Sequence, residues 1–331
     1  YDEDFYLSNK KSLTDELNKV VVGQKNAKKS LLDSVTSYNT TCDLPIFTFL
    51  GKSGVGKTSL AETFASAYAN HFETGHKVYI INCENYGDEK DAMRLFGSGQ
   101  QYADSFLGEL TSVVALYPRQ TLIFDEIEKA HSSVHRSLLT LLNKRKIRDY
   151  TTGMWIDFSQ CTFIFTTNLG ADSVDKMNES HHAFDMSALL RESQVRLPGF
   201  GKASSDKNLP IEFINRLASG HIVPFSSLNE WDLARLFLNL TAELNVQNNW
   251  AFNDFSFSKD YELADLLLDT YSGDFSPRSI VTHGDKLLSQ THAYLNDECQ
   301  AFQPISKLTK RGFAFKSRSF VVITDDKELR N

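Results

Sequence analysis

Short apolar runs alternate with amphipathic stretches over the first half of the chain. Four runs are apolar, β-branched or aromatic, and each predicts a β-strand: residues 46–50, 77–82, 121–124 and 161–166. Two stretches between these runs have apolar residues at helical spacing: Leu60, Phe64, Tyr68 and Phe72 in one, and residues 131–142 in the other. Strands that alternate with helices predict an α/β fold, a parallel sheet flanked by helices, in which ligands bind at the carboxyl ends of the strands.

The start of the chain has a different pattern. Residues 1–40 are polar and helical, and their apolar stripe consists of Leu13, Leu17, Val20 and Val21. Gly23 follows this stripe, and we expect it to break the helix.

The second half of the chain predicts a separate subdomain. Residues 171–209 are rich in polar side chains and read as a long connection, and from about residue 225 the pattern is helical. Residues 320–324 then form a strand-like run. The sequence therefore predicts a large α/β subdomain at 1–224, which includes the helical segment 1–40, and a smaller, mainly helical subdomain at 225–331 that ends in a strand.

Composition and charge narrow the class of protein. The 331 residues have a formal net charge of -7 and a pI near 5.7, which argues against a protein that coats nucleic acid or anionic membranes. No apolar run approaches the roughly 18 residues that a membrane span needs, and no signal peptide opens the chain. We therefore expect a cytoplasmic protein. Because Tyr1 rather than Met comes first, we expect a processed chain or a piece of a longer protein.

The loop after the first predicted strand has a phosphate-binding pattern. Gly51, Gly56, Lys57 and Thr58 satisfy G-x-x-x-x-G-K-[ST] between a strand and a helix, which is the context that this pattern requires. Glycines let backbone N–H groups turn toward phosphate oxygens, Lys57 reaches the outer phosphates, and Thr58 offers a hydroxyl to Mg²⁺. The other candidate residues of this loop are Ser53, Gly54, Val55 and Ser59. The alternative is a glycine-rich turn with a chance lysine.

Polar residues also end two later strands. The third run ends in Asp125 and Glu126, at the edge of the sheet where the phosphates are expected. We expect Asp125 to hold Mg²⁺ through water and Glu126 to polarise the attacking water, although two such carboxylates could instead cap the next helix. The fourth run ends before Asn168, whose amide could touch both the outer phosphate and the water. Alone, Asn168 could equally be a turn residue.

With these motifs in this order, the sequence resembles the Clp-type AAA+ ATPases, the protein unfoldases and disaggregases, and specifically an ATPase module of their second ring. The segments that carry this resemblance are VVGQ at 21–24, the phosphate loop, FDEIEKAH at 124–131, WIDFSQCTFIFTTNLG at 155–170 and PIEFINRL at 210–217. The resemblance implies a P-loop AAA+ fold with a helical lid, ATP and Mg²⁺ as cofactors, and a hexameric ring of identical subunits.

Further site residues follow from the resemblance alone. Arg216 matches the arginine finger, which reaches the nucleotide of a neighbouring subunit and would favour a closed, head-to-tail ring. Arg278 matches the lid arginine that senses the outer phosphate, although Ser276 and Pro277 precede it where the family has Gly-Ala. Val21 and Val22 match the residues that border the adenine, and ordinary core packing explains them equally well.

Tyr102 decides between two functions. It matches the tyrosine of the family's mobile axial loop, which grips a polypeptide in the bore of the ring, but its neighbours are not glycines. The basic cluster at 144–148 could face the bore, although such a run is usually a solvated face.

The resulting prediction is an ATP-driven motor that remodels or unfolds protein substrates by threading them past Tyr102, with a possible adaptor. The alternative is a non-threading AAA+ switch whose ATP-bound ring recruits a protein or nucleic acid. The net charge opposes the nucleic-acid form.

Overall fold

The computed structural model describes most of the first 229 residues and several later positions. The described residues are 3–38, 45–98, 106–171, 174, 209–229, 232, 233, 235, 236, 239, 243, 282, 313–316 and 319–322. The chain divides into two compact units, Tyr1–Ser227 and Leu228–Asn331. The subdomain roles expected for 1–224 and 225–331 stay predictions.

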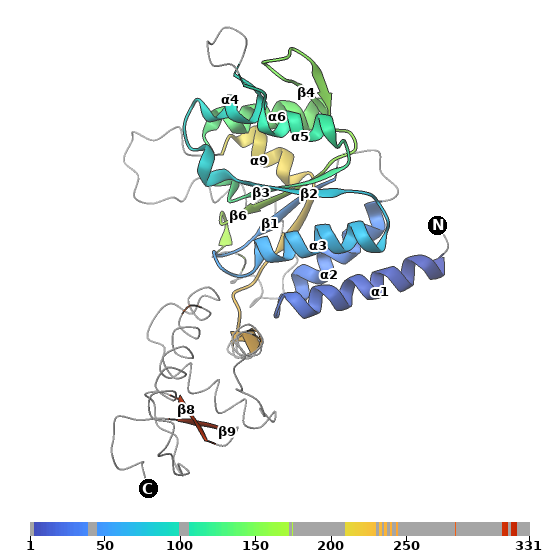
Figure 1. Cartoon of the computed structure of the whole chain (residues 1–331), viewed down its shortest axis with the longest axis vertical. Coiled ribbons are helices and arrows are strands. Elements are labelled where there is room, and N and C mark those ends of the chain that lie inside the picture. Colours follow the sequence, from blue (N-terminus) through green and yellow to red (C-terminus); the bar gives the residue numbers. More distant parts are fainter. Residues whose placement is uncertain are drawn as a thin grey trace. The chain divides into compact units, whose positions relative to one another are not determined.

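A five-stranded parallel sheet forms the centre of the first unit (Figure 1). Its strands lie in the order β2-β3-β6-β1-β7, and every neighbouring pair is parallel. The bounds of the strands are β1 Ile46–Leu50, β2 Lys77–Asn82, β3 Gln120–Asp125, β6 Thr162–Thr167 and β7 His221–Pro224. The four strands that the sequence predicts are therefore confirmed. The sequence did not predict β7, which adds the edge next to β1.

Helices cover both faces of this sheet (Figure 1). One group consists of α1 (Glu3–Val20), α2 (Lys25–Tyr38) and α3 (Lys57–His71), and the other of α4 (Asp91–Phe96), α5 (Glu109–Leu116), α6 (Ser132–Lys144) and α9 (Ile211–Ala218). Side chains alternate along a strand, so Phe47 and Phe49 of β1 join the core under the first group, whereas Ile46 and Leu50 join the core under the second. Burial on both faces explains why these strands are almost continuously apolar.

The apolar stripe near the start of the chain needs one correction. Leu13 and Leu17 of α1 are fully buried, and α1 ends just before Gly23, as expected. Val20, however, is 56% exposed. Val20 follows Leu17 by three positions and lies outside the core that Leu17 joins, whereas Val21 follows it by four positions and is buried in that core.

A hairpin follows α6 that the sequence did not predict. Its antiparallel strands are β4 (Lys146–Arg148) and β5 (Trp155–Asp157). Strands of three residues are too short for a clear alternation of apolar and polar positions. This hairpin contains much of the basic cluster at 144–148.

Within the second unit, the described elements are two antiparallel strands, β8 (Phe313–Lys316) and β9 (Ser319–Val322). β9 overlaps the strand that the sequence predicts at 320–324. The helices expected from residue 225 onward fall largely outside the described residues. Among the described helices of the whole chain, none has the length and apolar character to cross a membrane.

Candidate active site

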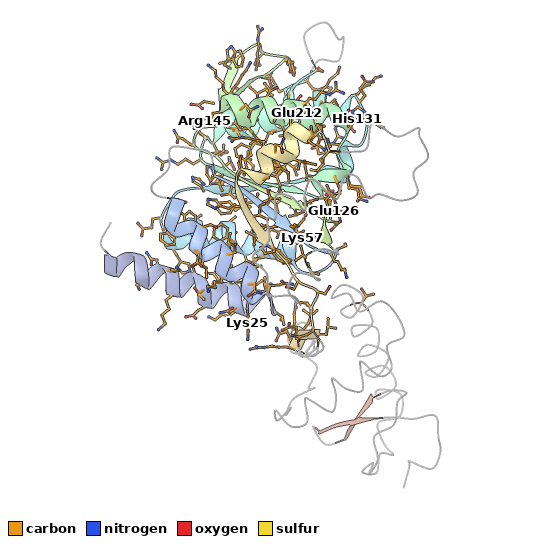
Figure 2. All side chains as sticks on the ribbon, turned by 180° about the vertical axis from the view of Figure 1, so that it is seen from behind. Lys25, Lys57, Glu126, His131, Arg145 and Glu212 are labelled. Carbon is orange, nitrogen blue, oxygen red and sulfur yellow. The ribbon has the colours of Figure 1, made fainter. Side chains whose placement is uncertain are left out.

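The carboxyl ends of three neighbouring strands bring the predicted site residues together. β1 leads into the phosphate loop, β3 ends at Asp125, and β6 is followed by Asn168. These strands are adjacent in the order β3-β6-β1, and Leu50 lies beside Thr167 across the β1–β6 pair. Figure 2 labels Lys57 and Glu126 at this edge. Residues far apart in the sequence therefore meet because the strands are parallel.

Glycine is required at several positions of the phosphate loop. Gly54 and Gly56 have φ angles of 79° and 96°, a conformation that residues with a Cβ rarely adopt. A Cβ on Gly51 would come within 2.7 Å of Phe225. Val55 is buried, and Ser53 and Ser59 are exposed on either side of the loop's centre. These conformations are compatible with phosphate binding by the backbone N–H groups, which stays a prediction.

Val21 and Val22 are both buried. Val21 shares a core cluster with Val55, and a Cβ on Gly56 would lie 3.6 Å from Val21 Cγ1. These contacts place Val21 next to the loop and account for it as core packing. A role for the two valines at the adenine stays a prediction.

Lys57 is the buried lysine of the loop, and the residue is only 6% exposed. Its Nζ donates hydrogen bonds to the carbonyl oxygens of Gly51 and Lys52, both at 2.6 Å, and to Asn168 Oδ1 at 2.8 Å. Burial lowers the pKa of Lys57 from 10.5 to about 8, and the carboxylates of Glu128, Asp125 and Glu126 partly oppose this shift. The ammonium is therefore held in a fixed place and is poorly solvated, so an anion there would stabilise it.

Thr58 and Asp125 form the predicted metal-binding pair. Thr58 Oγ1 donates to Asp125 Oδ1 at 2.7 Å, and Thr166 Oγ1 donates to the same oxygen at 2.6 Å. A hydroxyl and a carboxylate are oxygen ligands of the kind that Mg²⁺ takes beside substrate phosphates and water. Among the described residues no group of three His, Cys, Asp or Glu side chains could hold a metal. The pair fits Mg²⁺ only as part of a nucleotide complex.

Glu126 has an unusual backbone conformation. Its φ of 53° lies in the left-handed region, and its N–H donates to Thr166 Oγ1 at 2.9 Å. Non-glycine residues in this region are uncommon and cluster at functional sites. Asn168 Nδ2 lies 3.5 Å from Glu126 Oε1, while its Oδ1 accepts from Lys57. Asn168 therefore connects the phosphate-loop lysine to the predicted catalytic carboxylate.

Sequence reasoning missed two residues of this edge. Thr166 orients Asp125 and also accepts from the Glu126 backbone. Glu128 accepts from the Asn168 N–H at 3.0 Å through Oε1, and its other oxygen is buried without a hydrogen-bond partner among the described residues. Glu128 follows Glu126 by two positions, so a search for all carboxylates near the strand end could have found it. Nothing in the sequence singled out Thr166.

Gln24 is a third residue that sequence reasoning missed. It is buried, and its side chain donates to the carbonyl oxygens of Val55 and Ser226 at 3.2 and 2.8 Å. Its Oε1 accepts from the Ser226 N–H at 3.1 Å. One amide thus ties the phosphate loop to the segment that leaves β7.

Other predicted residues lie elsewhere. Arg216 is on α9, where its Nη2 donates to Leu142 O at 3.1 Å and its Nη1 to Ser219 Oγ at 3.4 Å. Its Nε is buried without a hydrogen-bond partner among the described residues. The structure does not join Arg216 to Lys57 or Asp125. Arg278 and Tyr102 fall outside the described residues.

Two side chains of the basic cluster support the hairpin. Lys146 Nζ lies 5.4 Å from the centre of the Trp155 ring, and Arg148 Nε donates to Gly153 O at 2.8 Å. Both side chains are nevertheless exposed. This cluster combines a structural role with a solvated face.

Comparison with known proteins defines the class that this fold and site represent. Residues 44–219 match the family model described as the AAA domain (Cdc48 subfamily), which is more than half of the chain. The chain therefore belongs to this family.

Individual relatives narrow the class. The chain is 32% identical over 232 residues to the chaperone protein ClpB of Gloeobacter violaceus, across 68% of this chain and 24% of that protein. It is 29% identical over 264 residues to heat shock protein 100 of Trypanosoma brucei brucei, across 78% of this chain and 28% of that protein. The matches thus span about a quarter of these relatives. Together with the family match, they make the chain an ATPase module of the Clp-type AAA+ class.

The fold is also similar to that of a solved structure. A closed-state cryo-EM reconstruction of Hsp104 with ATPγS and FITC casein aligns with a TM-score of 0.69 and 24% identity. The alignment covers 95% of this chain and 51% of that one. At this identity the likeness concerns the fold.

Proposed function

We propose that this chain is the motor module of a ring-forming ATPase that remodels or unfolds other proteins. The observation that carries the proposal is that residues with three predicted roles lie together at one edge of the sheet. Asn168 links Lys57 to Glu126, and Thr58 donates to Asp125. Phosphoryl transfer to water needs a cation that binds the phosphates, a carboxylate that activates the water and a pair of oxygen ligands for the metal.

Each residue has a distinct task in this proposal. The phosphate loop and Lys57 bind the phosphates, while Thr58 and Asp125 hold Mg²⁺, which neutralises charge on the phosphate oxygens when bound. Glu126 takes a proton from the attacking water, and Asn168 orients that water. The left-handed backbone of Glu126 and the link through Asn168 fix the carboxylate in direction before any substrate binds.

Arg216 supports the ring. Its hydrogen bonds lie with α6 and its own helix rather than with the phosphate loop of its own chain. An arginine that completes the site of a neighbour requires a head-to-tail interface, and a closed ring gives every subunit such a neighbour. We propose a hexamer of identical subunits, in which Arg216 stabilises transition-state charge in trans.

The substrate class is a further part of the proposal. Two of the relatives are a ClpB chaperone and a heat shock protein 100, and the similar Hsp104 structure was solved with FITC casein, which favours a polypeptide substrate here. We propose that Tyr102 grips it by apolar contact. Because the chain matches only about a quarter of those relatives, further domains or an adaptor would act with it.

The test is the steady-state rate of ATP hydrolysis with and without carboxymethylated α-lactalbumin, an unfolded polypeptide. We expect the polypeptide to stimulate the wild type, and Tyr102→Ala to lose the stimulation while basal hydrolysis stays intact. Tyr117→Ala, which removes a tyrosine that is 49% exposed, is the matched control. Basal hydrolysis that ignores both polypeptide and Tyr102 would contradict threading.

The rival function is a switch that recruits nucleic acid or protein without threading. The exposed Lys146 and Arg148 favour it. Binding to duplex DNA that weakens steeply with salt would support this function, since phosphate contacts release counterions. If no such binding occurs and the polypeptide stimulates ATP hydrolysis, the motor function is supported instead.

A further inference from the structure

The segment that carries Tyr102 has both its ends attached to the turn of the β4–β5 hairpin. Residues 99–105 are not described, but Ser98 and Phe106 on either side of them are. Thr151 Oγ1 accepts from the Ser98 N–H at 3.1 Å and donates to Phe106 O at 2.5 Å. This hydroxyl thus bridges the two ends of the segment, which are also joined directly where the Phe106 N–H donates to Ser98 Oγ at 3.0 Å.

Asp149 supports this bridge from within. It is 3% exposed, and its carboxylate accepts from the N–H groups of Thr151 and Thr152 at 3.0 and 2.8 Å. It also accepts from the Gly108 N–H at 3.2 Å and from the Thr111 hydroxyl. Burial by itself would raise the pKa of Asp149, but the hydrogen bonds from Thr111, Thr152 and Gly108 outweigh it and lower the pKa. The carboxylate therefore joins the hairpin turn to the start of α5.

Two glycines show how closely the two backbones approach. Gly97 has a φ of 95°, and a Cβ there would lie 2.7 Å from Thr151 Oγ1 and 2.9 Å from its backbone nitrogen. A Cβ on Gly108 would lie 2.5 Å from Leu95 O. Real Cβ atoms do not approach backbone atoms so closely. A side chain at Gly97 would push this residue away from the hairpin turn, and one at Gly108 would push it away from Leu95 and Gly97.

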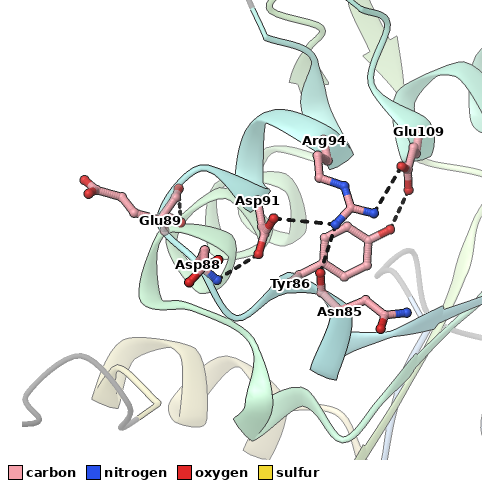
Figure 3. A network of polar contacts seen from close by, with 8 residues as sticks. Asn85, Tyr86, Asp88, Glu89, Asp91, Arg94 and Glu109 are labelled. Atoms are coloured by element: carbon pink, nitrogen blue, oxygen red, sulfur yellow. Dashed lines mark hydrogen bonds and ion pairs between the residues drawn. The ribbon is translucent and has the colours of Figure 1, made fainter.

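The same assembly is connected to the nucleotide edge. Tyr86 ends the 3₁₀ helix η1 (Cys83–Tyr86), which directly follows β2, and its carbonyl oxygen accepts from the His131 N–H at 2.8 Å. Its hydroxyl donates to Glu109 Oε2 at 2.5 Å, and Arg94 of α4 lies 3.6 Å from Glu109 Oε1 (Figure 3). Glu109 is the first residue of α5, next to Gly108. Tyr86 thus links His131, which follows Glu126 by five positions, to the helices α4 and α5 on either side of residues 99–105.

We propose that Thr151 and Asp149 are positioning residues that clamp Ser98, Phe106 and Gly108, which flank the Tyr102 segment, to the hairpin. Tyr86 and Glu109 connect this clamp to the catalytic edge. The inference deepens the proposed function, because it assigns residues that hold the polypeptide-gripping segment in place. Neither Thr151 nor Asp149 contacts the nucleotide residues, so their loss should change the action on polypeptide rather than the hydrolysis itself.

The test uses the full chain with Thr151→Val, which removes the hydroxyl, and Thr151→Ser, which keeps it. Thr140→Val is the matched control, since the Thr140 hydroxyl is exposed and donates only within its own helix. Asp149→Asn is a second variant in case Thr151→Val unfolds. Amide hydrogen exchange is followed over residues 96–108 and 149–155. We expect about tenfold faster exchange in Thr151→Val, and wild-type exchange in Thr151→Ser and Thr140→Val.

A second readout separates positioning from a merely structural role. In Thr151→Val we expect the half-maximal concentration of carboxymethylated α-lactalbumin to rise about tenfold, while basal hydrolysis stays within twofold. Wild-type exchange in Thr151→Val would overturn the clamp. Faster exchange without a change in the half-maximal polypeptide concentration would also overturn it, provided that Tyr102→Ala abolishes the stimulation. If Tyr102→Ala has no effect but exchange responds as expected, the clamp stands and the threading function fails.

Discussion

Asp125 and Asp149 are both acidic residues at the end of a strand, and both accept hydrogen bonds from threonine hydroxyls, yet their surroundings differ. The hydrogen bonds to Asp125 from Thr58 and Thr166 both fall on Oδ1. Asp149 accepts from both its oxygens, with donors from the hairpin, Gly108 and Thr111. Among the described residues, one oxygen of Asp125 is left for a ligand, whereas both oxygens of Asp149 accept hydrogen bonds from the chain itself.

A binding carboxylate differs from a positioning one in how many of its oxygens already have donors. A buried carboxylate is stable only when its oxygens find donors. Where the fold supplies all of them, the residue fixes structure, and where it supplies only some, a metal or substrate can complete the set.

The largest effect expected at the nucleotide edge is that of Glu126→Gln. The amide keeps the size of the side chain but does not accept the proton of water, so the turnover number should fall by about 10²- to 10⁴-fold. Binding of a fluorescent ATP analogue should persist. Glu84→Gln, at an exposed position of η1, should leave both unchanged. Turnover near wild type in Glu126→Gln would remove Glu126 from the catalytic role.

The clamp should respond in stability instead. Asp149→Asn should lower the free energy of unfolding by about 1–3 kcal/mol, since buried donors lose a charged acceptor. The folded pKa of Asp149 lies below its ordinary value of 3.8, so this contribution is present above that pH and is lost as the pH falls. Urea unfolding of the wild type and of Asp149→Asn at pH 7 measures the loss of stability, and the same comparison at pH 3.5 measures its pH dependence.

Asp157→Asn, on the exposed face of β5, provides the control for Asp149→Asn and should change stability by less than about 0.5 kcal/mol. Equal effects of the two substitutions would contradict the distinction between a clamped and an ordinary hairpin carboxylate.

The pH dependence of nucleotide binding should report on Lys57. Its pKa of about 8 means that the ammonium loses its proton above that pH in the free protein. Phosphates favour the charged form, so the dissociation constant should rise up to about tenfold per pH unit between pH 8 and the higher pKa of the complex. Titration with a fluorescent ATP analogue from pH 7 to 9.5 measures this slope. Lys57→Arg should remain flat, because arginine stays charged.

The smallest effect is expected for Tyr86→Phe. It removes the hydroxyl that donates to Glu109, but Arg94 still lies beside the same carboxylate. The free energy of unfolding should fall by about 0.5–1.5 kcal/mol, which is typical of one hydrogen bond, as measured by urea unfolding. A loss of polypeptide stimulation in Tyr86→Phe, with basal hydrolysis intact, would strengthen the connection between the clamp and the catalytic edge. An unchanged stability would argue against the contact.

Local patterns in the sequence predicted much of the fold and of the phosphate site. The apolar runs predicted β1, β2, β3 and β6, because strands buried on both faces are apolar at nearly every position. Gly51, Gly56 and Lys57 were found because their spacing is fixed by the shape of one short loop. The hairpin β4–β5 and the strand β7 were missed, since strands of three or four residues have no measurable period.

The sequence by itself determined the four longer strands of the sheet and predicted which residues bind phosphate, because both depend on neighbours that are close along the chain. Only the tertiary structure decided which distant residues meet. Asn168 reaches Lys57 across 111 positions, and Gln24 reaches Ser226 across 202. Such contacts are set by strand order and register, which no local spacing encodes. For the same reason, the attachment of the Tyr102 segment to Thr151 became visible only in the folded chain.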